Sequence, residues 1–361
     1  MTRLTAFSKR LRDRALRVAA AATLAWPAAL PAHAADTGAI PDGTRVQPGA
    51  DDTISASQKV DADKLFGAIV KVQTRSIPDA RSAETLGNER EGTGVVIGDN
   101  GLILTIGYLI VEADDVKVTD AKGRTLPARV VGYDHASGFG LLRTAVPLDA
   151  QPMAMGDSAK TEEREPVMIA SAGGDGTSFA WIVSKRPFTG NWEYELEYAL
   201  YTSPPTSNWS GAALIDRDGK LLGIGSLIVR EATSDDSKLP GNVFVPIDLL
   251  KPILSDLIRE GHRSGPARPW LGVSADEMQG RLFVTRVSPD GPADRAGVSV
   301  GDIILGVDTE PVRTQAQFYE RVWKRHAGDE VPLKVLQGVD VKDIKVKSID
   351  RVEYIRPRST I

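Results

Sequence analysis

Side chains that could act as nucleophiles, general bases or metal ligands are few in this chain of 361 residues, which has no cysteine and four histidines. Without cysteine, no thiol nucleophile, thiolate metal site or disulfide can form. Serine hydroxyls remain as nucleophiles, and each needs a base, usually a histidine that a carboxylate orients. Beyond residue 34 the histidines are His135, His262 and His326, too scattered for a metal site. We expect no metal and no cofactor, and few bases are available for hydroxyl chemistry.

The first 34 residues have the composition of a targeting segment. Six basic residues precede an apolar, alanine-rich run, Val18–Leu30, and Ala32-His33-Ala34 follows it. This order predicts a secretory signal peptide over residues 1–34; an uncleaved amphipathic anchor is the alternative. Residues 35–62 are polar and aperiodic, and we expect a disordered tether there. The mature chain is thus expected to be exported and to contain no membrane span; together with the resemblance described below, this implies secretion across the inner membrane into the periplasm.

The net charge of the chain indicates which classes of partner it disfavours. The whole chain has 44 basic and 48 acidic residues, a net charge of −4. The predicted signal peptide holds six of the basic residues and one of the acidic, so the remainder has a net charge of −9. Such an acidic chain disfavours nucleic acid and anionic membrane surfaces as partners.

Short apolar runs separated by turn residues extend from Phe66 to about Leu250 and predict an all-β sandwich or barrel, within a domain that we place at residues 63–260. Two hairpins are clear, with turns at Asn100-Gly101 and Asp218-Gly219. Tight hairpin turns favour these pairs because they need positive φ. The two turns lie about 120 positions apart, as expected for two similar consecutive barrels.

The C-terminal third begins with a predicted helix over Asp248–Arg259, with Pro252 in its first turn, where a missing N–H is tolerated. Residues 261–269 are predicted as a linker. A third unit covers residues 270–351, in which we predict a helix over Thr314–Lys324 followed by two strands.

Over residues 64–348 these segments together resemble the HtrA/Deg family of exported trypsin-like serine proteases with a C-terminal PDZ domain. The family segment Leu-Thr-Asn-x-His-Val-Val corresponds to residues 104–110, so Tyr108 stands at the histidine position. Asp-x-x-Thr-Asp-Leu-Ala-Leu-Leu corresponds to residues 134–142, so Gly138 stands at the aspartate position. The resemblance implies an all-β protease domain of two chymotrypsin-like β-barrels, then a small α+β PDZ domain. It also implies a degenerate member.

The nucleophile motif Gly-Asn-Ser-Gly-Gly-Pro-Leu of the family corresponds to residues 208–214, which places Ser210 at the nucleophile position. Trp209 beside it is expected to disturb the oxyanion hole, which needs accurately aimed N–H groups. We expect Ser210 to be inactive, and His135 is the alternative base, although Asp134 and His135 are interpreted as an exposed turn. Installing His at Tyr108 and Asp at Gly138 together is expected to restore weak activity.

The PDZ resemblance rests on Pro269-Trp270-Leu271-Gly272-Val273 and on the Pro-Ala-x-x-Ala-Gly and Gly-Asp-x-Ile patterns of residues 287–308. PDZ domains bind an extended C-terminal tail at a sheet edge. The resemblance implies that the backbone N–H groups of Leu271, Gly272 and Val273 hold the terminal carboxylate. Phe318 and Val322, on the facing helix, then favour an apolar last residue. Packing against the barrels, or a role in assembly, is the alternative for this domain.

A group of aromatic residues is expected near the specificity region of the second barrel, either lining a cleft or filling the core: Trp181, Trp192, Tyr194, Tyr198, Tyr201 and Trp209. We interpret the whole as an exported pseudoprotease that binds unfolded or C-terminally exposed polypeptides, in a chaperone or adaptor role in envelope protein quality control. The alternatives are an active serine endopeptidase using Ser210 at an unorthodox site, and an assembly scaffold for an active relative. The resemblance implies a homotrimer or a hetero-assembly.

Overall fold

The structure, a computed structural model, describes residues 62–173, 176–234 and 238–355. The predicted signal peptide and nearly all of the predicted tether lie outside these ranges. Among the described residues, no helix is long and apolar enough to cross a membrane.

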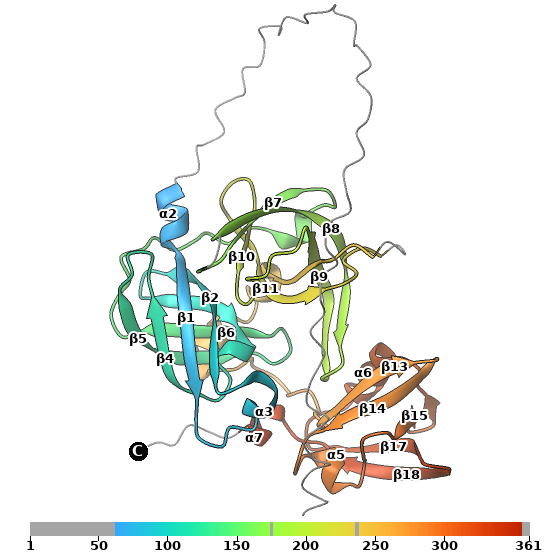
Figure 1. Cartoon of the computed structure of the whole chain (residues 1–361). Helices are drawn as coiled ribbons and strands as arrows, with labels where there is room; N and C mark the ends of the chain where they lie inside the picture. Colours follow the sequence, from blue (N-terminus) through green and yellow to red (C-terminus); the bar gives the residue numbers. More distant parts are fainter. Residues whose placement is uncertain (1–61, 174–175, 235–237, 356–361) are drawn as a thin grey trace, which may run out of the picture. The chain divides into compact units, whose positions relative to one another are not determined.

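The first β-barrel closes through six antiparallel strands in the order β1-β2-β3-β6-β5-β4 (Figure 1). The short helix α2 (Ala62–Gly67) precedes it, and α3 (Ala83–Leu86) lies in the connection between its first two strands. The strands are β1 (Ile69–Ser76), β2 (Glu89–Gly98), β3 (Leu102–Ile106), β4 (Ala113–Thr119), β5 (Thr125–Tyr133) and β6 (Phe139–Thr144). One 3-10 turn, η1 (Gly107–Leu109), directly follows β3.

The second barrel repeats this closure with the order β10-β11-β12-β9-β8-β7. A 3-10 turn, η2 (Ser158–Lys160), precedes it. Its strands are β7 (Pro166–Ala170), β8 (Thr177–Gly190), β9 (Tyr194–Ser203), β10 (Ala213–Ile215), β11 (Leu221–Val229) and β12 (Gly241–Pro246). Strands β8 and β9 are long, and their hairpin reaches beyond the barrel towards the C-terminal domain (Figure 1).

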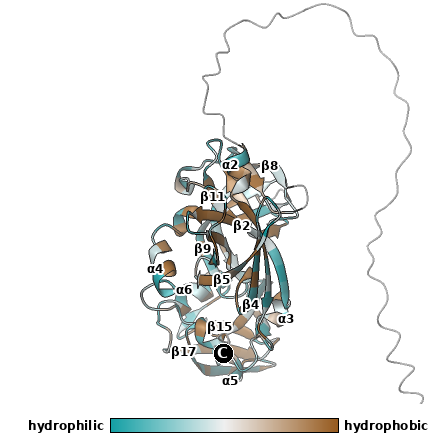
Figure 2. Ribbon diagram, turned by 90° about the vertical axis from the view of Figure 1, so that its left-hand side faces the viewer, coloured by the Kyte–Doolittle hydropathy of each residue, from teal (hydrophilic) through white to brown (hydrophobic). Residues whose placement is uncertain are grey.

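The apolar runs of the sequence fill the barrel interiors, and Figure 2 shows hydrophobic residues gathered along the barrel strands. One cluster of buried side chains includes residues of both barrels, such as Ile103 and Phe139 in the first and Val243 in the second. Both expected hairpins form, and their turn glycines Gly101 and Gly219 have φ of 72° and 79°. The turn chemistry of the sequence therefore sets the register of these strands.

The predicted helix over Asp248–Arg259 is wrong in its first half. The chain forms a 3-10 turn, η3 (Ile247–Leu249), and the α-helix α4 begins only at Leu254 and ends at Glu260. Pro252 explains the delay, because proline disfavours the α conformation in the residue before it and lacks an N–H of its own.

The C-terminal domain is a sheet in the order β13-β14-β15-β17-β18, with β13 at one edge and β16 paired to β15. Its strands are β13 (Val273–Met278), β14 (Arg281–Val287), β15 (Ile303–Val307), β16 (Glu310–Pro311), β17 (Glu330–Gln337) and β18 (Asp340–Lys347). The helices are α5 (Pro292–Arg295), α6 (Gln315–Val322) and α7 (Arg351–Tyr354). This α+β arrangement after two β-barrels confirms the predicted fold class.

Candidate functional site

The structure brings Tyr108 and Ser210 together between the two barrels. Tyr108 lies on η1, at the end of β3, and Ser210 lies in the turn before β10. The Tyr108 hydroxyl lies 2.9 Å from Ser210 Oγ and 3.0 Å from the Ser226 carbonyl oxygen, both at hydrogen-bond distance. The residue at the histidine position therefore touches the residue at the nucleophile position, across 102 positions of sequence.

Buried polar contacts hold the turn that carries Tyr108. The Arg90 guanidinium, from β2, donates to the carbonyls of Tyr108 at 3.1 Å and Val111 at 2.6 Å. Thr74 of β1 donates its hydroxyl to the Leu109 carbonyl at 2.6 Å. Carbonyls at the end of β3 are thus satisfied by side chains, and Tyr108 is fixed in one position.

The contact between Tyr108 and Ser210 involves a phenol with a single proton. The Ser226 carbonyl can only accept a proton, so it competes with Ser210 Oγ for that of Tyr108. A general base must accept the serine proton, and a neutral phenol is a very weak base. Burial raises the pKa of Tyr108 to about 12, so its basic phenolate form is almost absent at neutral pH. Tyr108 therefore connects the two barrels through its hydroxyl contacts with Ser210 and Ser226.

Gly138 lies in the turn between β5 and β6, and its carbonyl accepts from Gly107 N at 2.7 Å. Its φ is 81°, and a Cβ added there would lie 3.0 Å from the Tyr194 hydroxyl. Tyr194 is buried and donates that hydroxyl to the Ser137 carbonyl at 2.6 Å. A tyrosine of the second barrel therefore occupies the space beside Gly138.

The interpretation of Asp134 and His135 as an exposed turn is wrong. Asp134 is 5% exposed and accepts hydrogen bonds from Ser137 N and Oγ, and its carboxylate pairs with Arg263 at 2.8 Å. The His135 ring packs edge-on against Tyr133, with centroids 4.2 Å apart. Burial, and then the charge of Arg351, lower the pKa of His135 well below its ordinary value. Asp134 is thus committed to its own turn and to Arg263, and His135 is a neutral imidazole.

The turn around Ser210 packs closely against the backbone of β2. The Ser210 carbonyl accepts from Thr93 N at 2.8 Å. Gly211 has a φ of 74°, and a Cβ there would lie 2.0 Å from the Thr93 carbonyl oxygen. Trypsin-like oxyanion holes use the N–H of the nucleophile and of the residue two positions earlier. Here that earlier N–H, at Asn208, donates to Thr206 Oγ1 at 3.3 Å, so it is already engaged.

A cavity of about 710 Å³ opens in front of Ser210. Aromatic side chains line it from both barrels and from the C-terminal part: Tyr108, Trp192, Tyr194, Trp209, Trp270 and Tyr354. Arg81, Arg286 and Arg351 add positive charge, and His135 lies on the same wall. Neither His135 nitrogen has a hydrogen-bond partner among the described residues.

The predicted aromatic group divides into two parts. Trp192, Tyr194 and Trp209 line the cavity, and the rings of Trp192 and Tyr194 are stacked 5.6 Å apart. The other three lie on the barrel away from it: Trp181 is 53% exposed, Tyr198 contacts Ser158, and Tyr201 lies under Arg186.

In the PDZ domain, the three predicted backbone N–H groups point at one carboxylate. Leu271, Gly272 and Val273 donate to the Glu193 side chain at 2.9, 2.6 and 2.9 Å. Phe318 and Val322 are each 1% exposed and belong to the core of this domain. The sequence pattern located the carboxylate-binding turn, but it did not indicate Glu193, which lies 78 positions earlier.

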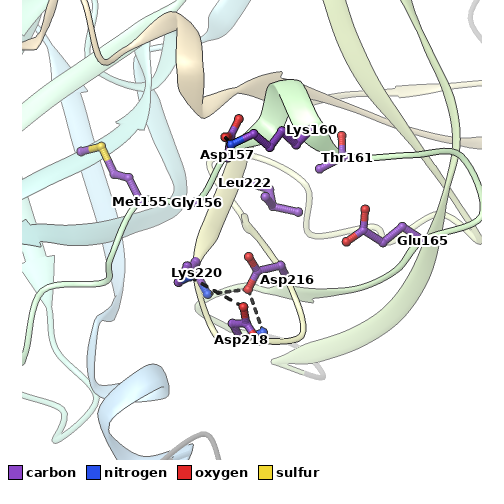
Figure 3. Close-up of a pocket in the computed structure, with 10 residues that line it drawn as sticks. All are labelled: Met155, Gly156, Asp157, Lys160, Thr161, Glu165, Asp216, Asp218, Lys220 and Leu222. Carbon is purple, nitrogen blue, oxygen red and sulfur yellow. Dashed lines mark hydrogen bonds and ion pairs between the residues drawn. The ribbon is translucent and has the colours of Figure 1, made fainter. Parts of the chain in front are cut away.

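A second cavity, of about 370 Å³, lies beside the β10–β11 hairpin and is polar (Figure 3). Asp216 there accepts from the N–H groups of Asp218 and Lys220, at 2.9 and 2.8 Å, as hairpin turns often do. Asp157 is paired with Lys160 at 2.6 Å. Since these charges are used within their own turns, this cavity offers no catalytic group.

Sequence comparison agrees with this architecture. Residues 92–224 match the trypsin-like peptidase domain and residues 269–348 match the PDZ domain. The chain is 27% identical over 288 residues to the serine protease Do-like HtrA of Lactobacillus helveticus, covering 71% of this chain and 68% of that protein. It is 26% identical over 317 residues to the serine endoprotease DegS of Escherichia coli K12, covering 79% and 84%.

A probable periplasmic serine endoprotease DegP-like of Halomonas elongata is 27% identical over 71% of this chain, which spans only 55% of that relative. Among solved structures, a variant of the HtrA-type protease AlgW with a tripeptide matches 82% of this chain, with a TM-score of 0.51 and 20% identity. Two barrels followed by a PDZ domain define a trypsin-like protein of the HtrA type. The chain has a trypsin-like peptidase domain and a PDZ domain, and it is similar to serine proteases of the HtrA family.

Proposed function

We propose that this HtrA-like protein is a pseudoprotease that binds unfolded or C-terminally exposed polypeptides after export to the periplasm. The observation that carries the proposal is the phenol of Tyr108, which lies 2.9 Å from Ser210 Oγ where an active enzyme needs a base, and whose pKa burial raises to about 12. The absence of a side chain at Gly138 supports it, because no carboxylate stands there to orient a base.

Polypeptide binding is supported by two features of the chain. The cavity in front of Ser210 is lined mainly by aromatic and apolar groups, which suit extended chains with exposed hydrophobic residues. The PDZ domain adds a turn of N–H groups at the end of an edge strand, the recognition mode for free C-termini. Periplasmic location is a property of named relatives such as the DegP-like protein, and we extend it to this chain with its predicted signal peptide.

The test uses the purified chain from residue 35, with Ser210→Ala and Tyr108→Phe variants beside it. Fluorescently labelled casein, which lacks stable structure, serves as substrate. We expect no fragment release by any of the three, and equal suppression of aggregation of a chemically denatured client by parent and Ser210→Ala. The Tyr108→Phe variant loses the hydrogen bond but gains no base, so it stays inert as well.

Cleavage by the parent but not by Ser210→Ala would overturn the pseudoprotease proposal in favour of an active endopeptidase. His135→Ala would then test the neutral imidazole that shares the cavity with Ser210. If the parent neither cleaves casein nor prevents aggregation, polypeptide binding is wrong and the scaffold alternative gains support.

A further inference from the structure

The turn between β8 and β9 inserts a carboxylate into the PDZ domain. Glu193 has a φ of 57°, and its side chain accepts three backbone N–H groups, from Leu271, Gly272 and Val273. The residue is 8% exposed. Among the described residues no basic side chain is within ion-pair distance of this carboxylate, so backbone amides hold it.

The same turn also pairs with the edge of the PDZ sheet. Ala275 N, on edge strand β13, donates to the Asn191 carbonyl at 3.2 Å. The Asn191 amide donates in turn to Asp276 Oδ1 at 2.8 Å. A peptide whose C-terminus binds a PDZ domain makes main-chain hydrogen bonds to the edge strand, and its terminal carboxylate accepts from the backbone N–H groups of the adjoining turn. The β8–β9 turn makes the same two kinds of contact.

Helix α6 closes the other side of the turn. The Tyr319 hydroxyl donates to the Gly190 carbonyl at 2.8 Å and accepts from Glu193 N at 3.0 Å. The turn thus lies between β13 and α6, in the groove where a tail would bind. Its contacts link residues of the second barrel to PDZ residues 78 to 129 positions later.

We propose that the β8–β9 turn is an internal ligand of the PDZ groove, with the Glu193 side chain in the place of a C-terminal carboxylate. A polypeptide tail with a free carboxylate enters only by displacing this turn. This inference rests on the proposed function, because it states how tail binding is regulated at the same groove.

Competition of this kind weakens tail binding without changing the groove. The apparent dissociation constant equals the intrinsic one divided by the fraction of molecules whose groove is free. A variant that lacks the internal carboxylate should therefore bind free C-termini more tightly. The charged and titratable groups around Glu193 are Arg351 of α7 and Tyr319 of α6, and Tyr319 in turn interacts with Glu195 of β9 and Asp276 of β13.

The first test needs no ligand. Amide hydrogen exchange of Leu271, Gly272 and Val273 is measured in the chain from residue 35, in the parent and in Glu193→Ala. We expect at least tenfold faster exchange in the variant. Glu197→Ala, which changes an exposed glutamate of β9 four positions later, is the control and should leave these amides protected. Glu193→Gln, which keeps the side-chain volume, serves if Glu193→Ala does not fold.

The second test measures binding of a pool of heptapeptides that end in Val, Leu or Ile, as free acids and as C-terminal amides. Glu193→Ala should bind the free acids at least tenfold more tightly than the parent, and the amides no better. Unchanged exchange, together with equal peptide affinity in parent and variant, would overturn the internal ligand and leave the proposed function standing. Faster exchange with no peptide bound by either protein would support the internal ligand and contradict tail binding.

Discussion

A tyrosine at position 108 keeps a contact between the barrels but is a poor base. Its hydroxyl lies 2.9 Å from Ser210 Oγ, and burial raises its pKa to about 12, so it stays protonated at neutral pH. Reinstalling the missing groups is harder than the sequence suggests. An aspartate at Gly138 would have to adopt a φ of 81° with its Cβ 3.0 Å from the Tyr194 hydroxyl. The double change at Tyr108 and Gly138 therefore needs a smaller residue at Tyr194 as well.

Glu193 gives the protein a pH-dependent stability at the residue scale. Burial raises its pKa from 4.5 to about 7, against the three amide hydrogen bonds and Arg351, which lower it. Between these values the folded chain holds one more proton than the unfolded chain, so the free energy of unfolding falls as pH rises. Below pH 4.5 both states are protonated, and above pH 7 both are ionised. The contribution is on the order of 3 kcal/mol, at about 1.4 kcal/mol per pH unit.

The measurement is urea unfolding of the parent and of Glu193→Gln between pH 4.5 and 8. As pH rises, the free energy of unfolding of the parent should fall relative to that of Glu193→Gln, because glutamine does not ionise. A difference independent of pH would show that Glu193 titrates alike in the folded and unfolded chains.

Among the elements, the turn before β10 depends on glycine at position 211. A Cβ there would lie 2.0 Å from the Thr93 carbonyl oxygen and 2.8 Å from Thr105 Oγ1. We expect Gly211→Ala to lower the free energy of unfolding by about 3 kcal/mol or more, from overpacking added to left-handed strain. Denaturant titration followed by tryptophan fluorescence measures it.

Gly123→Ala is the matched control for this turn. Gly123 has a similar φ of 79°, but nothing lies within 4 Å of the position of its Cβ. Its substitution should cost only the conformational strain, about 1–2 kcal/mol. Equal losses for the two variants would mean that the β2 backbone moves away from the Ser210 turn without cost.

At the scale of the whole molecule, the PDZ domain and the second barrel are joined through the β8–β9 turn. If this turn docks as one unit, loss of the Tyr319 hydroxyl and loss of the Glu193 charge must be coupled. A double-mutant cycle of Tyr319→Phe with Glu193→Gln should give an interaction energy of about 1 kcal/mol or more, since contacting residues are typically non-additive.

The control cycle pairs Glu193→Gln with Tyr198→Phe, because the Tyr198 hydroxyl contacts Ser158 in the second barrel and not the PDZ domain. Its interaction energy should stay within about 0.5 kcal/mol. Additive effects of Tyr319 and Glu193 would argue that α6 and the N–H turn hold the hairpin independently.

Several features of the site were predictable because short segments of the sequence specify them. Alternating apolar runs and the Asn-Gly and Asp-Gly turns specify two barrels, and motif spacing located Tyr108, Gly138, Ser210 and the turn of Leu271–Val273. The helix over Asp248–Arg259 was overestimated because the apolar period continued through Pro252, whose effect on the backbone was stronger.

By itself the sequence determined the resemblance to HtrA proteases, the order of the barrels and the PDZ domain, and the residue types at positions 108 and 138, since residue type is a property of the chain alone. Only the tertiary structure decided which side chains surround these positions. Tyr194 fills the space beside Gly138, Asp134 is buried against Arg263, and Glu193 occupies the PDZ turn. These contacts join residues 56 to 129 positions apart, and such partners are chosen by packing and by the need to satisfy buried polar groups, which no local pattern records.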